Sequence, residues 1–453
     1  MIDRFCFFRP GPAGLRPWVR SALIVFLSAS QSCASRRLKV DSEIGVDNPS
    51  FPATIAGISG RRFSDRNRIE IISTGEATFE RLFEMIDTAK HSINLELYIY
   101  NTDTTGDLLA DKLIARARDG VRVNLLVDAV GGFYFEDETA ERLRAGGVRV
   151  HLYNPWNYFD MWGYRIRTHR RVVVVDGRRG MLGGFAVTDW WREPYHYNRY
   201  PVYDLQAYVE GDVAAQLQSV FLENWKQVSN EILTGPAYFP EQRPPIHNDR
   251  DSNTEPRTSP GDWPPLRAMT SGSSPPREVP HESTSTIYES YLFAIHSARK
   301  TIRIFTPFFV PDRSLAEALV DAVARGVDVR VVIPHERFVL ESPAYYAGHN
   351  YYEQLLDGGV RLFHFEVGLL HSKGAVFDGM YGLIGSTNFD QRSFKIDYEN
   401  DLHIYDEDLA SRLDGLYDFY ERNSGELTLL EFRERGLWPR SQECLWKPLE
   451  HEF

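Results

Sequence analysis

Cysteine is scarce in this chain. Of 453 residues only three are cysteines, Cys6, Cys33 and Cys444, and no C-x-x-C pair occurs. A folded body that begins after Cys33 therefore holds a single thiol, which excludes an internal disulfide framework and a zinc site built from cysteines.

Positive charge is also in deficit, because the formal net charge is -12 at pH 7. A dedicated nucleic-acid-binding protein usually carries a basic surface, so this balance favours other functions, although it leaves room for a local basic cleft. Hydrophobic residues make up 43% and charged residues 25% of the chain. That mixture is typical of a globular protein and not of a disordered one.

No apolar run in the chain reaches the ~20 residues that are needed to span a bilayer. The N-terminus nevertheless has the pattern of a targeting segment, because arginines up to Arg20 precede a short apolar run at 22–27 and small residues follow at 28–34. We expect residues 1–40 to form a cleaved signal or lipoprotein-like leader with Cys33 as the lipidated residue. An uncleaved membrane-surface anchor and a disordered leader are the alternatives.

The chain contains two copies of one unit, which is the first feature to seek in a sequence. Each copy has a strand, a helix, a glycine, a second strand, a histidine-containing motif and a pair of small residues in the same order. The matched segments are 86–93 with 295–302, 121–127 with 327–333, 147–150 with 359–362, 168–176 with 370–378 and 183–184 with 385–386. Two unrelated α/β domains would not share this order of motifs.

Apolar strands that alternate with amphipathic helices predict α/β units with a largely parallel sheet. We expect two similar α/β lobes side by side, with helices at about 107–118 and 314–325. The predicted divisions are a first lobe at 68–235, a linker at 236–264, a second lobe at 265–435 and a tail at 436–453. The linker is polar and rich in proline, which is typical of a surface excursion.

Each half contains the pattern His-x-(Lys/Arg)-x4-Asp. The residues are His169, Arg171 and Asp176 in the first half and His371, Lys373 and Asp378 in the second. The apolar run between cation and acid predicts a strand, on which residues two apart share a face. One imidazole and one cation from each half could therefore meet a phosphate together.

Phosphodiester transfer without a metal needs a nucleophile, a general acid for the departing alcohol, and cations for the phosphoryl charge. Two histidines can divide the first two tasks if their environments differ. Ser386 and Asn388 follow the second motif and could bind phosphate oxygens. Glu399, further on, could fix the tautomer of an imidazole.

These stretches resemble the phospholipase D superfamily, and in particular its bacterial cardiolipin synthase branch. The resemblance rests on residues 306–312, 371–378, 385–393 and 154–157, and it covers roughly 68 to 435. It implies two phospholipase D-type α/β lobes packed as a pseudo-dimer with one composite active site. It also implies a membrane-associated protein of the bacterial cell envelope.

The resemblance also implies roles for residues of this chain. His169 and His371 would be the catalytic pair, with Arg171 and Lys373 as phosphate-binding cations. The supporting residues would be Asp176, Asp378, Ser386, Asn388 and the imidazole-orienting acids Glu399 and Asp204. The placement of Asp204 rests on a generic stretch, Tyr203–Leu205.

The chain departs from the family pattern at two positions. Arg171 stands where the family has lysine, and Ala186 where it has asparagine. Arginine keeps the charge and can hold phosphate through two bonds, but it is larger. Alanine removes a polar contact, so a half-degenerate site that binds lipid without turnover is an alternative.

The implied reaction is cardiolipin synthesis, in which a phosphatidyl group moves between phospholipids through a phosphohistidine. Its substrates would be phosphatidylglycerol and possibly phosphatidylethanolamine at a membrane surface, with no metal, no organic cofactor and no nucleic acid. The alternatives are a phospholipase D hydrolase, a nuclease of the superfamily and a lipid-binding pseudoenzyme. Either histidine could be the nucleophile, and the resemblance favours His169.

Aromatic residues cluster just before the first motif, at 156–164. Trp and Tyr prefer membrane interfaces, so this segment is either an acyl-chain wall or membrane-dipping loop, or ordinary packing between the lobes. Residues 133–135 and 190–191 could belong to the same surface. We expect His196, His247 and His349 to be surface residues and not ligands.

Overall fold

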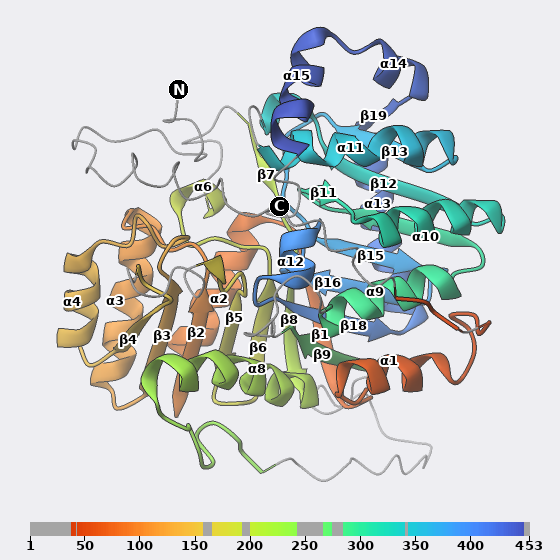
Figure 1. Ribbon diagram of the computed structural model, residues 1–453. Coiled ribbons are helices and arrows are strands. Elements are labelled where there is room, and N and C mark those ends of the chain that lie inside the picture. The colour runs from red at the N-terminus through yellow and green to blue at the C-terminus, as the bar shows by residue number, and fades with distance from the viewer. Residues whose placement is uncertain are drawn as a thin grey trace.

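Two α/β lobes lie side by side in the computed structural model (Figure 1). The structure describes residues 38–41, 43–156, 165–192, 200–241, 266–273, 284–339 and 343–447. The predicted leader, most of the linker and residues 157–164 of the aromatic segment lie outside these ranges. So do His196 and His247.

The first lobe is built on a seven-stranded sheet in the order β1-β8-β6-β5-β2-β3-β4. Its strands are β1 (Asn67–Ile72), β2 (Ser92–Leu97), β3 (Arg122–Asp128), β4 (Arg149–Tyr153), β5 (Val172–Val175), β6 (Arg179–Gly183) and β8 (Gln206–Gly211). The second lobe has an eight-stranded sheet in the order β19-β13-β12-β10-β15-β16-β18-β9. Its strands are β9 (Ala268–Gly272), β10 (Thr301–Phe305), β12 (Asp328–Pro334), β13 (Arg361–Phe365), β15 (Gly374–Phe377), β16 (Tyr381–Gly385), β18 (Asn400–Tyr405) and β19 (Ser424–Leu427).

Both sheets are mixed, so the expectation of a largely parallel sheet was wrong. Only β2–β3–β4 and their equivalents β10–β12–β13 run parallel. The remaining ladders are antiparallel in both lobes. The cause is the hairpin that follows each histidine motif, β5–β6 and β15–β16, which reverses the chain and starts an antiparallel run.

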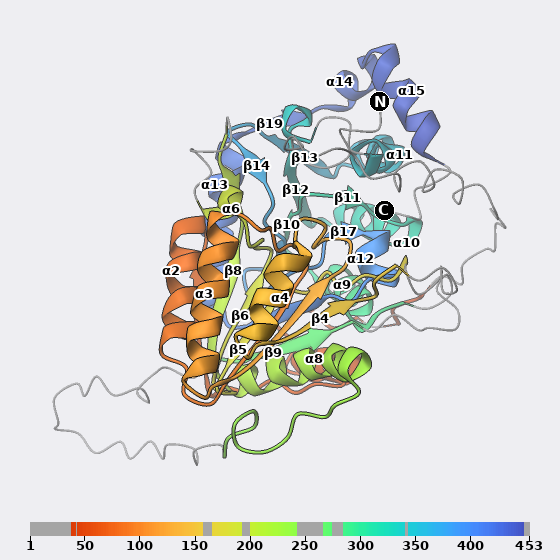
Figure 2. The same ribbon diagram turned by 90° about the vertical axis from the view of Figure 1, so that its left-hand side faces the viewer.

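Each lobe carries further helices, the longer of which pack against its sheet or against one another. In the first lobe they are α2 (Gly75–Asp87), α3 (Thr104–Arg118), α4 (Asp137–Ala145) and α6 (Asp189–Arg192). In the second they are α9 (Thr286–Ser297), α10 (Arg313–Ala324), η3 (Glu336–Phe338), α11 (Pro343–Asp357) and α12 (Gln391–Lys395). Figure 2 shows α2 and α3 side by side. Aspartates cap the matched helices, since Asp103 accepts from Gly106 N on α3 and Asp312 accepts from Leu315 N on α10.

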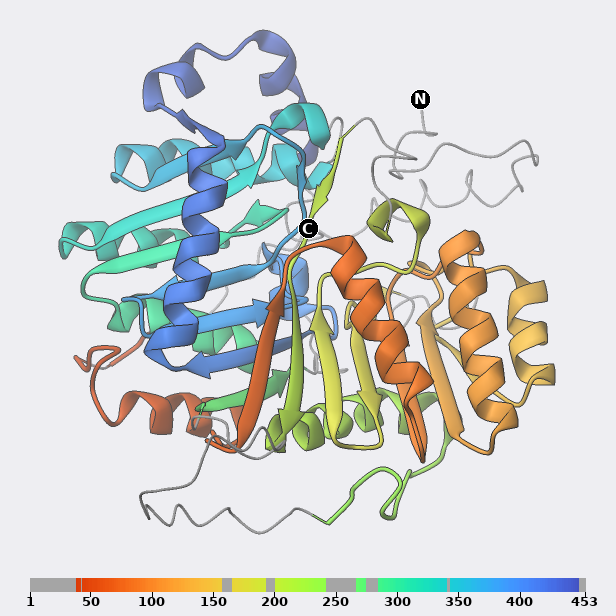
Figure 3. The ribbon, with the colours of Figure 1, turned by 180° about the vertical axis from the view of Figure 1, so that it is seen from behind.

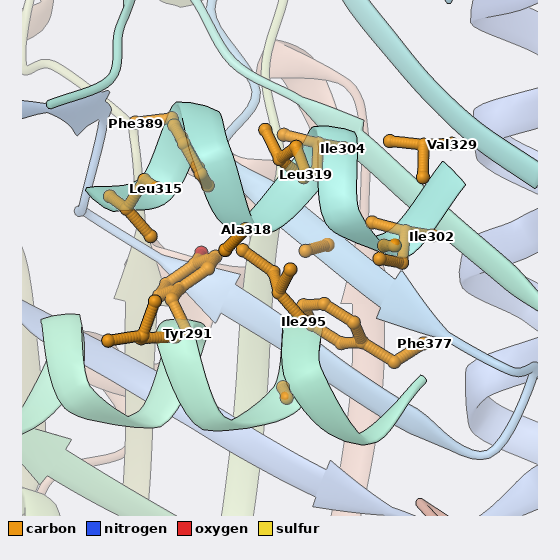
Figure 4. Packing of buried hydrophobic residues seen from close by; sticks show 14 of the residues in the cluster. Tyr291, Ile295, Ile302, Ile304, Leu315, Ala318, Leu319, Val329, Phe377 and Phe389 are labelled. Carbon is orange, nitrogen blue, oxygen red and sulfur yellow. The ribbon is translucent and has the colours of Figure 1, made fainter. Parts of the chain in front are cut away.

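Two further helices hold the lobes together. One is α8 (Asp212–Ser229), which lies in front of the first sheet in Figure 1. The other is its equivalent α13 (Glu407–Arg422), which lies in front of the second sheet when the molecule is seen from behind in Figure 3. One hydrophobic cluster contains buried residues from α8, α13 and strands of both sheets. Each lobe also has its own core, and Figure 4 shows that of the second lobe, where Tyr291 and Ile295 of α9 face Leu319 of α10. The lobes therefore share a continuous interior and form one body.

Two short strand pairs lie outside the large sheets, and one of them joins the lobes. They are β7 (Val202–Tyr203) with β14 (Leu369–Leu370), and β11 (Phe309–Val310) with β17 (Phe389–Asp390). The β7–β14 pair joins the first lobe to the second directly before Asp204 and His371.

Two segments extend the second lobe beyond the predicted divisions. Near the N-terminus, α1 (Phe51–Ser59) contributes Phe51 and Ile55 to the second-lobe core. At the C-terminus, α14 (Leu429–Glu434) ends the predicted second lobe and α15 (Leu437–Trp446) occupies part of the predicted tail. The expectation of a surface His349 was wrong, because that residue is buried and its Nδ1 lies 2.8 Å from Glu443 Oε1 on α15.

The described residues hold no helix that combines the length and apolar character needed to cross a membrane.

Candidate active site

The two histidine motifs open the central hairpin of each lobe. The run after each cation forms a fully buried strand, β5 or β15, as predicted. The strands begin after the cations, so His169 and His371 stand just before them and not within them. Each cation still lies against its own histidine, because Arg171 Nη1 donates to His169 O at 2.5 Å and Lys373 Nζ donates to His371 O at 2.7 Å.

Each histidine is bound by a carboxylate of the other lobe. His169 Nδ1 lies 2.8 Å from Glu399 Oε1, and His371 Nδ1 lies 3.0 Å from Asp204 Oδ2. The backbone repeats this exchange, since His169 N donates to Tyr398 O at 2.9 Å and His371 N donates to Tyr203 O at 2.7 Å. Neither lobe therefore completes its histidine without the other.

Both histidines are exposed to the same two cations. The side chains of His169 and His371 are 12% and 14% exposed, which leaves each imidazole a narrow opening. Burial, followed by the charges of Arg171 and Lys373, lowers the pKa of His169 well below its usual value. Burial and Lys373, with a smaller effect of Arg171, lower the pKa of His371 to about 3. Both imidazoles thus lie within the influence of the same two cations, whose charge suits an anionic ligand.

Three side chains converge on Glu399. Ser386 Oγ donates to Oε2, while Ser393 Oγ donates to Oε1 at 2.7 Å beside the His169 contact. Burial raises the pKa of Glu399 to about 7, although both serine hydrogen bonds act to lower it. Because a carboxylate can only accept, His169 Nδ1 carries the hydrogen in its contact with Glu399. The lone pair of the neutral imidazole is therefore on Nε2.

Asp204 has a different set of donors. Trp191 Nε1 donates to Oδ2 at 2.7 Å, and the backbone N–H of Leu205 donates to Oδ1 at 2.8 Å. Burial alone would raise the pKa of Asp204, but His371 and Lys373 outweigh it and lower that pKa. Gly184 is required here, because a Cβ on it would stand 2.3 Å from Asp204 Oδ1.

The two cations are buried, and the carboxylates of Asp204 and Glu399 offset part of the cost of burying their charge. Arg171 and Lys373 are each 1% exposed. Burial lowers the pKa of Arg171 and lowers that of Lys373 to about 7. The guanidinium of Arg171 also packs over the ring of Tyr98, whose edge meets His169.

Ala186, one of the two departures from the family pattern, stands at the position equivalent to Asn388 of the second lobe. Asn388 is buried, and its Oδ1 has no hydrogen-bond partner among the residues that the structure describes. Ala186, its equivalent, is fully buried in the first-lobe core. The polar lining of the site is therefore one-sided, since only the second lobe presents an amide.

Asp176 and Asp378 lie at the far ends of β5 and β15 from the histidines. Asp176 accepts from the backbone N–H groups of residues 90–92, and Asp378 accepts from those of 299–301. Both have positive φ, 54° and 55°, and each precedes a glycine in a hairpin turn that requires this conformation. Their contacts hold the first residues of β2 and β10 in place. These aspartates therefore stabilise the strands that support the site and do not face the histidines.

Sequence reasoning missed two residues. Arg170 is fully buried and binds Glu399 O at 3.0 Å and Ser273 O at 2.9 Å, which attaches the first motif to the strand end that carries Glu399. Trp191 was considered as part of an aromatic surface, but it is buried and contacts Asp204 and His371. Phe135, considered for the same surface, is buried in the first-lobe core. Phe133 and Trp156 are exposed, at 74% and 49%.

A family model described as "Cardiolipin synthase, PLD-like domain" matches residues 82–225 and 291–418, which is once in each lobe. The chain belongs to this family. The sequence-based assignment to the phospholipase D superfamily and its cardiolipin synthase branch, as an enzyme with two similar α/β lobes, is thereby confirmed.

Relatives agree with that assignment. Cardiolipin synthase 2 of Bacillus anthracis is 30% identical over 383 residues, which are 83% of this chain and 69% of that protein. Cardiolipin synthase A of Pseudomonas putida is 30% identical over 423 residues, 92% of this chain and 78% of that protein. Among solved structures, phosphatidylserine synthase of Haemophilus influenzae Rd KW20 has a TM-score of 0.63 and covers 89% of this chain and 100% of its own. At 15% identity, that likeness shows the fold alone.

Proposed function

We propose that this protein is a phosphatidyltransferase that joins the phosphatidyl group of one phospholipid to the headgroup hydroxyl of another, as a cardiolipin synthase does. One observation carries the proposal, namely that each histidine is bound through Nδ1 by an acid of the other lobe. That arrangement occupies Nδ1 of both imidazoles and directs Nε2 to the chemistry, with Lys373 Nζ 3.1 Å from Nε2 of His371. It supplies a nucleophile and an acid to one phosphate, with Arg171 and Lys373 for its charge.

In the first step His169 Nε2 attacks the phosphorus of a phosphatidylglycerol. The bond from phosphorus to the glycerol headgroup breaks, and the departing oxygen takes a proton from His371, so glycerol leaves and a phosphatidyl-histidine remains. In the second step His371 removes the proton of the headgroup hydroxyl of another phosphatidylglycerol. That oxygen attacks phosphorus, cardiolipin forms and His169 is released. Phosphatidylethanolamine is a possible alternative substrate.

The unlike environments of the two histidines support this division of roles. Asp204 has a lowered pKa and is held as an anion, which favours the protonated form of His371 once an anionic phosphate enters the pocket. Glu399 has a pKa raised to about 7 and receives two serine hydroxyls, so it supports the His169 cation less. His169 is therefore assigned as nucleophile and His371 as acid and then base. Ser386 and Asn388 are proposed as phosphate contacts.

The test is incubation of purified protein with phosphatidylglycerol vesicles, followed by mass spectrometry of the lipids. We expect cardiolipin and glycerol in equal amounts, and none from a variant that carries both His169→Ala and His371→Ala. If phosphatidic acid were the main product, the protein would be a hydrolase and not a transferase. Degradation of added DNA without lipid turnover would indicate a nuclease, and no turnover of either would indicate a lipid-binding pseudoenzyme.

We also propose that the protein works at a membrane surface of the cell envelope, attached by residues 1–40. The short basic and apolar leader with Cys33 supports this. Full-length protein should sediment with membranes, and deletion of residues 1–40 should weaken that sedimentation. Full-length protein found entirely in the soluble fraction would contradict the proposal.

A further inference from the structure

Trp191 contacts both members of the Asp204–His371 pair. It lies on α6 of the first lobe and is 7% exposed. Its Nε1–H donates to Asp204 Oδ2 at 2.7 Å, and that oxygen also faces His371 Nδ1 at 3.0 Å. The indole and imidazole rings meet edge to face, with centroids 5.0 Å apart and planes at 89°. One side chain therefore holds the carboxylate and packs against the imidazole.

The direction of this hydrogen bond is fixed by chemistry. An indole N–H can only donate, whereas serine and imidazole can exchange roles. Asp204 Oδ2 must therefore be an acceptor toward Trp191 whatever the protonation of His371. Within the part of the chain that the structure describes, the side chains that hydrogen-bond to Asp204 are those of His371 and Trp191.

The internal repeat places a donor at the same position in the other half. Trp191 and Ser393 stand equally far after Gly183 and Gly385, the glycines that begin the matched segments. Ser393 Oγ donates to Glu399 Oε1 at 2.7 Å. Both lobes thus use this position to bind the imidazole-orienting acid, with unlike side chains.

Among the described residues of the first lobe, Trp191 is the side chain that donates to Asp204, beside the backbone N–H of Leu205. Ser386 gives Glu399 an additional hydroxyl, but its equivalent is Gly184, where the close approach of Asp204 leaves no room for a side chain. The orientation of the Asp204 carboxylate consequently depends on Trp191 more than that of Glu399 depends on Ser393.

We propose that Trp191 is a positioning residue for His371, which holds Asp204 and the imidazole in the orientation that proton transfer needs. The proposal rests on the proposed function for its kinetic consequence, because proton transfer by His371 belongs to that reaction. Partners that orient a reacting or ligating imidazole typically contribute ~10- to 100-fold when removed. The charged groups that face His371 are Asp204, Lys373 and Arg171, and a substitution at Trp191 leaves all three charges in place.

The test compares Trp191→Phe with Trp190→Phe in the full-length protein. The first change keeps an aromatic ring and removes the donor. The second removes the neighbouring indole, which packs against the first-lobe core. We expect Trp191→Phe to lower kcat by ~10- to 100-fold with KM within twofold of wild type, while Trp190→Phe keeps wild-type kcat.

A second measurement does not depend on turnover. In Trp191→Phe the carboxylate of Asp204 loses a donor and binds the imidazolium proton more strongly, so the pKa of His371 should rise. NMR titration of the His371 ring resonances in wild type and both variants measures it. If the protein transfers no lipid, the proposed function is wrong. The titration still tests the role of Trp191, because it measures the pKa of His371 without turnover.

Replacing Trp191 by 3-benzothienylalanine separates the hydrogen bond from packing, because sulfur replaces N–H in a ring of nearly the same shape. The proposal predicts the same loss of kcat and the same rise in the pKa of His371 as Trp191→Phe. Wild-type kcat and an unchanged His371 titration in this variant would overturn it. A kcat loss in Trp190→Phe as large as in Trp191→Phe would also overturn it.

Discussion

In the half-site around His169, two serine hydroxyls donate to Glu399, whereas in the half-site around His371 an indole and a backbone amide donate to Asp204. The repeat preserves the geometry, because each imidazole has a carboxylate of the other lobe at its Nδ1. It changes the electrostatics, because the pKa of Glu399 is raised to about 7 and that of Asp204 is lowered. Duplication supplies two histidines in one pocket, and divergence makes them chemically unlike.

The largest effect should come from loss of either histidine. His169→Ala and His371→Ala should each remove nearly all turnover, because nucleophile and acid act in one reaction and as a unit. Transfer between vesicle phospholipids measures this, with the exposed His91→Ala as control. If each single variant kept roughly half of the activity, the half-sites would be independent and the composite site would be wrong.

The next effect concerns the cations that distinguish the halves. Arg171→Ala and Lys373→Ala should each lower the rate by ~10²-fold, because a buried cation at developing phosphoryl charge is worth ~3 kcal/mol. Arg171→Lys should retain substantial activity, since lysine restores the charge that the family pattern places there. If Arg171→Lys were as inactive as Arg171→Ala, charge alone would not describe the role of Arg171.

Both cations should also hold the histidine pKa values down in the free protein. Removing a neighbouring positive charge favours the imidazolium, so Lys373→Met should raise the pKa of His371 from about 3, and Arg171→Met should raise the pKa of His169. NMR titration in the absence of lipid tests this. A fall in either pKa would show that the cation does not act through charge.

Asn388→Ala makes the second half-site resemble the first, which has Ala186 at this place. Loss of one polar contact to a charged phosphate should cost about 1.5–3 kcal/mol, or ~10- to 100-fold in kcat/KM. Asn48→Ala serves as control, because Asn48 is half-buried and its side chain accepts from Ser50 N just before α1. Unchanged kcat/KM in Asn388→Ala would remove Asn388 from the phosphate contacts.

The smallest effect on chemistry should come from the motif aspartates. Asp176→Ala and Asp378→Ala each leave backbone N–H groups without their acceptor, which should destabilise the fold by about 1–3 kcal/mol. Thermal unfolding should show this in both variants, while His169 and His371 keep their NMR titrations at a temperature where the variants are folded. A changed histidine titration with unchanged stability would assign the aspartates to the site itself.

The histidines, cations and duplicated order were visible in the sequence because each motif is local. Sheet direction was not, since the hairpins at Asp176 and Asp378 reverse the chain without changing the apolar pattern of the strands. His349 and Trp191 were misjudged for a related reason. Their partners, Glu443 and Asp204, lie on separate elements that only the tertiary fold brings to them.

The most direct test of two unlike half-sites is to denature the wild-type enzyme at neutral pH during turnover of phospholipid radiolabelled at phosphorus, because the histidine–phosphorus bond is labile in acid, and to map the label by mass spectrometry of its peptides. We expect label on His169 and none on His371, because only His169 acts as nucleophile. Equal label on both histidines would show that the half-sites are chemically alike. Label on neither, with both His→Ala variants still active, would contradict the phosphohistidine and the composite site together.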